Sequence, residues 1–143
     1  MLFRSAAAKA RVPVVVAPGC LDMVNFGEQA SVPPKFATRT FYIHNPQVTL
    51  MRTNAQECAE LGRIVAEKTN AYGQAAILIP TKAISVISAP GKSFHDPAAD
   101  QALFGALKRH ARVPVQEFDL EINDPAFAQA CARRLIELMQ SRR

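Results

Sequence analysis

The fold is decided by the stretch Pro18-Gly19-Cys20-Leu21-Asp22-Met23-Val24-Asn25-Phe26-Gly27 and by the six residues before it. Those six, residues 12–17, read Val-Pro-Val-Val-Val-Ala, an uncharged and mostly β-branched run typical of strands buried on both faces. In open α/β sheets, ligands bind beside loops that leave the carboxyl ends of strands. Glycines at both ends of the stretch permit sharp turns there. The sequence therefore predicts a buried strand followed by a loop at a possible binding edge.

Polar and apolar residues alternate within residues 18–27. Cys20, Asp22 and Asn25 carry a thiol, a carboxylate and an amide between apolar neighbours. One interpretation is a partly enclosed binding site. The other is a structural loop in which Asp22 and Asn25 hydrogen-bond to their own backbone. The spacing favours neither interpretation over the other.

Length and composition favour one α/β domain. The 143 residues are 49% hydrophobic and 20% charged, which suffices for a sizeable core. No run approaches the roughly 20 apolar residues of a membrane helix. The three cysteines are odd in number and lack metal-ligand spacing, which favours a reducing, cytoplasmic location. The net charge of +5 is not gathered in a basic-aromatic pattern, so nucleic acid is a weak hypothesis for a partner.

Strand-like segments recur after the first strand. Apolar or β-branched runs predict strands over residues 40–43, 75–80 and 113–119. Residues 83–88 are also apolar, and they fit either a short strand or an extended loop. Helical patterns separate most of these segments, which is the order expected of a largely parallel sheet.

Helix starts are marked by capping residues. Asn54 forms a capping-box pattern with Glu57, and proline follows both Asp96 and Asp124. The alternation of strands and helices predicts the α/β class with a three-layer, Rossmann-like architecture. In it, helices flank a mostly parallel sheet of about four to five strands.

The start of the chain predicts a longer protein. Residues 2–10 are alanine-rich and predict a short helix that runs straight into the strand at 12–17. No strand precedes that helix, although helices of α/β folds lie between strands. We therefore interpret residues 1–143 as one domain from the later part of a longer protein, with residues 1–10 as the end of a truncated helix.

A second polar loop, residues 44–53, follows the strand at 40–43 and precedes a helix. The N-terminus of that helix offers free N–H groups and a positive dipole end, both of which suit an anion. Arg52 could bind a phosphate or a carboxylate through its guanidinium, and Thr53 adds a hydroxyl. The alternative is ordinary capping by Thr53 or Asn54, with Arg52 in solvent.

Three further side chains could carry chemistry. His44, beside Asn45, could be a general base or a metal ligand, although a lone histidine at a strand end is more often a hydrogen-bonded structural residue. Asp22 could hold Mg²⁺ beside phosphates, because Mg²⁺ favours one or two carboxylates together with substrate oxygens. Cys20 would need a nearby base to act as a nucleophile.

Long motifs of the chain resemble a known family. Residues 18–27, 42–53, 91–100 and 122–127 resemble the family of the ATP-binding domain of the tomato mosaic virus resistance protein. The resemblance spans nearly the whole chain after the first ten residues, and residues 82–88 depart from its pattern. It implies a protein of two Rossmann-like halves, of which this chain is the C-terminal one, and ATP or a related nucleotide as ligand, to which the Asp22 carboxylate would add Mg²⁺. The ligand-facing positions that it implies are Gly19, Asp22, Asn25, His44, Asn45, Arg52 and Thr53.

Two functions of different classes follow. In the first, loops 18–27 and 44–53 meet across a crevice and bind a nucleotide or phosphometabolite, with Asp22 on a metal or hydroxyl and Arg52 on phosphate. In the second, the same loops form a homodimer interface or an interface with the missing N-terminal domain. The second rests on residues that are unusually apolar for loops. They are Phe26, Val48, Leu50 and Met51.

Overall fold

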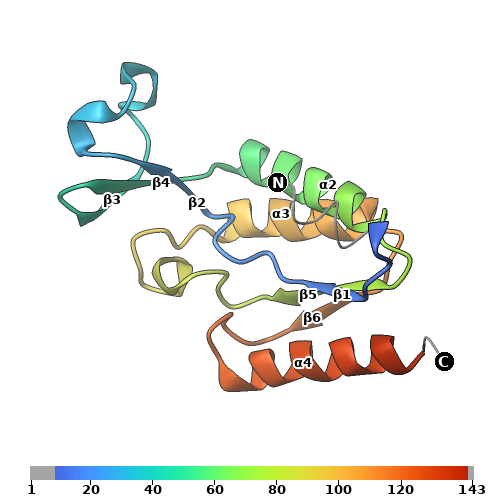
Figure 1. Ribbon diagram of the computed structural model, residues 1–143. Coiled ribbons are helices and arrows are strands. Elements are labelled where there is room, and N and C mark those ends of the chain that lie inside the picture. Colours follow the sequence, from blue (N-terminus) through green and yellow to red (C-terminus); the bar gives the residue numbers. More distant parts are fainter. Residues whose placement is uncertain (1–8, 142–143) are drawn as a thin grey trace.

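A parallel sheet in the order β1-β5-β6 lies at the centre of the computed structural model, which describes residues 9–141. Its strands are β1 (Val14–Val16), β5 (Ala75–Pro80) and β6 (Val115–Phe118). As Figure 1 shows, α2 and α3 cover one face and α4 covers the other. These helices span Ala55–Thr69, Pro97–His110 and Pro125–Gln140. The α/β class and the helix-flanked, Rossmann-like parallel sheet are confirmed.

The central strand β5 explains the apolar composition of residues 75–80. It pairs in parallel with β1 on one side and with β6 on the other. Ile77 and Ile79 belong to the core under α2 and α3, whereas Ala76 and Leu78 belong to the core under α4. All four side chains are completely buried. A strand covered on both faces cannot alternate polar with apolar residues, and this one does not.

Residues 23–52 form a separate antiparallel arm between β1 and α2. Its strands are β2 (Met23–Phe26), β3 (Phe41–Asn45) and β4 (Val48–Arg52), in the order β2-β4-β3. Short 3-10 turns at Gln29–Ser31 and Pro34–Phe36 connect β2 with β3. In Figure 1 the arm stands off from the three-layered body.

The arm corrects the prediction that residues 18–27 and 44–53 are loops. Met23–Phe26 pairs with Thr49–Arg52 in an antiparallel ladder, so the second half of each predicted loop is a strand. Leu50 and Met51, expected as exposed apolar loop residues, are buried at 7% and 2% exposure. Their hydrophobicity therefore reflects packing of β4.

The number of strands in the parallel sheet is also corrected. The strand predicted at residues 40–43 exists as β3, but it pairs antiparallel with β4 in the arm. Among the described residues, the parallel sheet therefore has three strands in place of about four to five. Residues 83–88 combine both alternatives, because Ala83 forms a single parallel bridge with Glu121 and Val86–Ser88 is a 3-10 turn.

The predicted helix starts are confirmed. Asn54 accepts a hydrogen bond from the backbone N–H of Glu57, and the Glu57 side chain accepts from the N–H of Asn54, which completes the capping box. Asp96 and Asp124 cap α3 and α4 ahead of their prolines. The helix predicted over residues 2–10 falls mostly on residues 1–8, which lie outside the described part of the chain.

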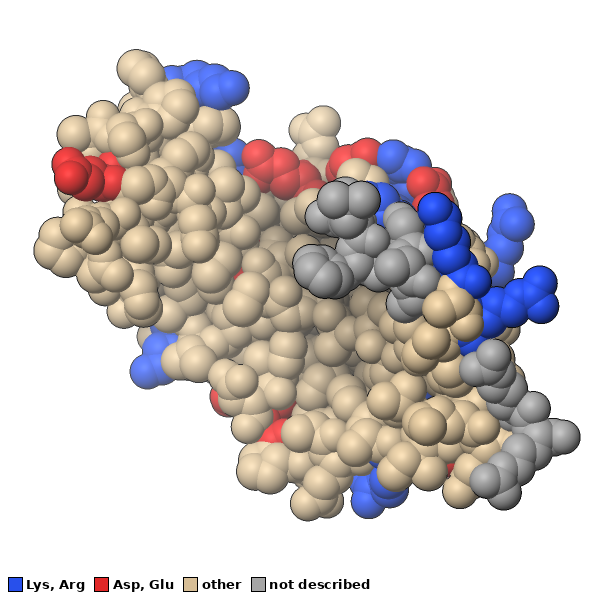
Figure 2. Space-filling model, viewed as in Figure 1, with Lys and Arg blue, Asp and Glu red and all other residues tan. Residues whose placement is uncertain are grey.

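Charge is spread over the visible surface. On the face in Figure 2, Lys and Arg side chains lie in separate groups, some of them beside acidic ones, and uncharged residues cover most of the middle. Between residues 9 and 141, none of the helices is both long enough and apolar enough to cross a membrane.

Candidate ligand site at the carboxyl edge of the sheet

The loop that follows β1 is fastened to two other strand-end segments. The N–H of Cys20 donates to the carbonyl of Ile84 at 2.9 Å, and the N–H of Ile122 donates to the carbonyl of Ala83 at 2.9 Å. Gly19 fits against Ile122 so closely that a Cβ there would lie 2.7 Å from the Ile122 Cδ1 atom. Segments after β1, β5 and β6 thus meet at one edge, as expected for parallel strands.

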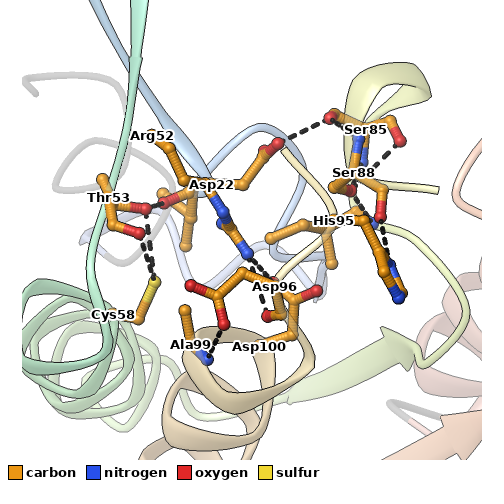
Figure 3. Close-up of polar contacts among 12 residues, drawn as sticks. Asp22, Arg52, Thr53, Cys58, Ser85, Ser88, His95, Asp96, Ala99 and Asp100 are labelled. Atoms are coloured by element: carbon orange, nitrogen blue, oxygen red, sulfur yellow. Dashed lines mark hydrogen bonds and ion pairs between the residues drawn. The ribbon is translucent and has the colours of Figure 1, made fainter. Parts of the chain in front are cut away.

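Asp22 lies completely buried at this edge. Its Oδ2 atom accepts a hydrogen bond of 2.6 Å from the Ser85 hydroxyl (Figure 3). Ser85 is held in turn by Ser88, since the N–H of each residue donates to the hydroxyl oxygen of the other, at 3.0 and 3.1 Å. The Oδ1 atom of Asp22 is buried and has no hydrogen-bond partner among residues 9–141.

Arg52 enters the same region from the end of β4 and is 5% exposed. Its Nη2 atom lies 2.6 Å from the Asp100 Oδ1 atom and donates to the carbonyl of Asp96 at 3.2 Å. Its Nε and Nη1 atoms are buried, and within the described part of the chain they have no partner. Burial raises the pKa of Asp100, and the hydrogen bond and charge of Arg52 oppose that effect.

Thr53 connects the loop that carries Asp22 with the strand that carries Arg52. Its hydroxyl donates to the carbonyl of Leu21 at 2.8 Å, and its N–H donates to the carbonyl of Asp22 at 3.0 Å. The Thr53 Oγ1 atom also lies 3.2 Å from the Cys58 Sγ atom. Burial is the main reason that the pKa of the Cys58 thiol is raised. We refer to Asp22, Arg52, Thr53, Ser85 and Asp100 as the polar cluster.

The structure thus divides the predicted site residues into two groups. Asp22, Arg52 and Thr53 come together in the polar cluster, with Gly19 on the loop leading to it. The other three belong to the arm and are exposed. They are Asn25 on β2 and His44 and Asn45 on β3.

Asn45 has a local structural role. Its Oδ1 atom accepts a hydrogen bond of 2.9 Å from the N–H of Gln47, at the turn between β3 and β4. An asparagine side chain commonly stabilises a tight turn in this way. Asn45 therefore stabilises the β3–β4 turn, a role that was not predicted for it from the sequence.

Sequence reasoning missed three residues of the site, namely Ser85, Ser88 and Asp100. Ser85 and Ser88 have the spacing of an N-cap pair, a signal that marks a local turn and does not reveal its contact with Asp22. Asp100 lies in the first turn of α3, where an acidic residue is common. Its buried contact with Arg52 joins residues 48 positions apart.

The polar cluster is not arranged as a metal centre by itself. Within residues 9–141, no group of three or more His, Cys, Asp or Glu side chains could hold a metal ion. Asp22 offers one free carboxylate oxygen, whereas Asp100 is engaged by Arg52. Mg²⁺ at Asp22 would need most of its oxygens from a bound ligand and water, the usual arrangement for this ion beside phosphates.

Fold and site together define a Rossmann-like α/β domain with a buried polar cluster at the carboxyl edge of its sheet and an antiparallel arm inserted after β1. The chain belongs to the uncharacterised protein family UPF0261 and matches the C-terminal domain of that family over residues 4–139. The family resemblance of its motifs is thereby confirmed.

Several relatives are much longer than this chain. A UPF0261 protein of Clostridium tetani is 45% identical over 139 residues, which are 94% of this chain and 34% of the relative. A UPF0261 protein of Rhizobium meliloti is 45% identical over 130 residues, covering 87% and 33%. The ToMV resistance protein Tm-1(GCR237) of Solanum lycopersicum is 38% identical over 133 residues, covering 90% and 18%. The chain therefore spans about a third of the bacterial relatives' length.

Proposed function

We propose that this domain binds a nucleotide or another phosphorylated metabolite at the carboxyl edge of its parallel sheet. The observation that carries the proposal is the Arg52 guanidinium, which is buried and positively charged yet leaves Nε and Nη1 without acceptors. A buried donor without a partner costs on the order of 1–3 kcal/mol. Anionic oxygens, one beside each of these nitrogens, would recover that free energy.

The surroundings of Arg52 suit an anion of this kind. Asp100 fixes the guanidinium through Nη2, so the directions of the Nε–H and Nη1–H groups are set before a ligand arrives. Nε–H and Nη1–H lie on different edges of the guanidinium, so each would donate to a separate anionic oxygen of a phosphorylated ligand. The free Oδ1 atom of Asp22 supplies an acceptor for a ligand hydroxyl or for a Mg²⁺-bound water. This combination supports the nucleotide that the family resemblance implies.

The experiment is thermal unfolding of the chain with and without MgATP and, separately, with inorganic triphosphate. A ligand at about 100 times its Kd stabilises the native state by about 2.7 kcal/mol. For 143 residues the entropy of unfolding is roughly 0.3 kcal/mol per kelvin, so the Tm should rise by about 9 °C.

Arg52→Lys is the informative variant. Lysine retains a positive charge for Asp100 but lacks the two nitrogens that we assign to the ligand. The Tm rise should therefore disappear when each protein is compared with its own ligand-free state. Arg63→Lys is the matched control, because Arg63 pairs with Glu60 and Glu67 on the exposed side of α2. No Tm rise with either compound, or a full rise in Arg52→Lys, refutes the proposal.

A second candidate function is an interface formed by the arm. Val24 and Ile43 are 39% and 55% exposed on β2 and β3. A hollow of about 390 Å³ lies between β2 and the start of α2, lined by Val24, Leu61 and the stems of polar residues. Exposed apolar surface of this kind is common at interfaces. Ile43→Lys tests this candidate.

Size-exclusion chromatography with light scattering measures the molar mass of the chain in solution and distinguishes this candidate from the first. If the arm forms a homodimer, Ile43→Lys yields monomers at concentrations where the unmodified chain is dimeric, and MgATP binding persists. Val86→Lys is the control, since Val86 is 64% exposed but lies outside the arm. A chain that is monomeric at every concentration rules the homodimer out.

A further inference from the structure

The two edge strands of the parallel sheet differ in the polarity of their side chains. β6, at one edge, carries Gln116 and Glu117 exposed, and Glu117 forms an ion pair of 2.8 Å with Lys108. β1, at the other edge, is Val14-Val15-Val16 and carries no polar side chain. Proteins protect genuine edge strands with charged side chains, because an open edge pairs with other chains. The β6 edge has this protection and the β1 edge lacks it.

The backbone of β1 has groups available for pairing on its outer side. The N–H of Val14 donates to the carbonyl of Gln74 at 3.0 Å, toward β5. Because residues of a parallel strand alternate between their two neighbours, Val15 directs its N–H and C=O away from β5. No strand of the described residues pairs with β1 on that side. Pro13 lies one residue before the strand, so it does not remove this donor.

Apolar side chains surround this edge. Val12 is 48% exposed, and on α4, which packs over β1, Ile136 and Met139 are 52% and 57% exposed. Val12, Pro13, Leu135 and Met139 line a hollow of about 250 Å³. An open strand edge beside exposed apolar side chains is the arrangement left when a neighbouring strand and its side chains are absent.

We propose that β1 is an interior strand of the longer protein, and that the segment preceding residue 1 supplies a further parallel strand to the open edge of β1. The bacterial relatives are about three times as long as this chain and the family match is to a C-terminal domain, so a longer family member has chain that could supply this strand. A parallel neighbour requires a crossover connection, usually a helix, and the sequence predicts a helix over residues 2–10, ahead of β1. This proposal is independent of the phosphate site.

The test compares the 143-residue chain with a full-length UPF0261 protein that contains it. Hydrogen exchange followed by NMR should show the Val15 amide at least about a hundredfold slower in the longer protein, because only there is it hydrogen-bonded. The Val14 amide, already bonded to Gln74, serves as the internal reference. Equal exchange rates of Val15 in the two proteins overturn the proposal.

Val12→Lys provides a second readout. It places a charge where we expect the added strand to bury the Val12 side chain, so the Tm of the longer protein should fall by roughly 5 °C while that of the short chain changes by about 1 °C or less. Val86→Lys, at another exposed valine, should leave both unchanged. An equal effect of Val12→Lys on both proteins overturns the proposal. A dimer of the short chain would also overturn the proposal if two results are found together. Val12→Lys must dissociate the dimer, and the Val15 amide in the dimer must be as protected as in the longer protein. A second copy of the chain would then occupy the edge of β1.

Discussion

Replacing Gly62 by alanine tests how closely α2 and α3 approach each other. Gly62 lies in the interior of α2, facing α3. A Cβ at this position would lie 2.6 Å from the Leu103 carbonyl oxygen and 2.8 Å from the Ala106 Cβ atom. The first neighbour is backbone, so relief requires a shift of a whole helix. That spacing also places Asp100 on α3 against Arg52, so the contact bears on the site.

The expected change in the free energy of unfolding combines two opposing effects. Alanine in a helix interior is favoured over glycine by about 1 kcal/mol. Overpacking a close contact costs about 1–3 kcal/mol and sometimes more, and this contact is with backbone. We therefore expect Gly62→Ala to lower the free energy of unfolding by about 1–2 kcal/mol. With roughly 0.3 kcal/mol per kelvin of unfolding entropy, the Tm should fall by about 3–6 °C.

Gly105→Ala is the matched control, because Gly105 lies inside α3 and a Cβ added there would meet no atom within 4 Å. There the helix preference acts alone, and the Tm should rise by about 3 °C. Urea and thermal unfolding of both variants provide the measurement. If Gly62→Ala is as stabilising as Gly105→Ala, the described packing of α2 on α3 is wrong.

Two other predictions concern the polar contacts. Ser85→Ala removes the hydroxyl bonded to buried Asp22, so urea unfolding should show a loss of about 1–3 kcal/mol, and a loss under about 0.5 kcal/mol would contradict the contact. Hydrogen bonds from Arg39 hold the pKa of Glu57 below its usual 4.5. The resulting stability is present above that pH and is lost as the pH falls through the lowered pKa. Arg39→Gln should therefore flatten the acid side of the stability–pH curve, and an unchanged curve would argue against the pairing.

Local signals in the sequence were sufficient to predict the main strands and helices of the three-layered body. The uncharged runs at 12–17 and 75–80 predicted β1 and β5 because strands covered on both faces exclude polar side chains. Capping residues at Asn54, Asp96 and Asp124 predicted the helix starts because each satisfies backbone N–H groups within a few residues. Both signals act over short sequence distances.

The arm and the polar cluster depend on contacts that no short window contains. β2 becomes a strand because it pairs with β4, and a strand of four residues with Asn25 in it resembles a loop when considered alone. Asp22 meets Ser85 across 63 positions, so its burial could not be inferred from its neighbours in sequence. The sequence identified Asp22, Arg52 and Thr53 as chemically informative, but it could not distinguish residues that face a cleft from residues enclosed by the fold.

The arm begins and ends at one place in the body. Met23 pairs with Arg52, and the N–H of Thr53 bonds to the carbonyl of Asp22, so the chain returns to the point from which it left. The two ends of the arm are therefore held together at its base, and the path from β1 through α2 to β5 does not depend on the length of the arm. Each doubling of a loop's length adds only about 0.6 kcal/mol of closure entropy. The length of the arm beyond this base can therefore change while the sheet keeps its connectivity, so the arm is an insertion on the three-layered body.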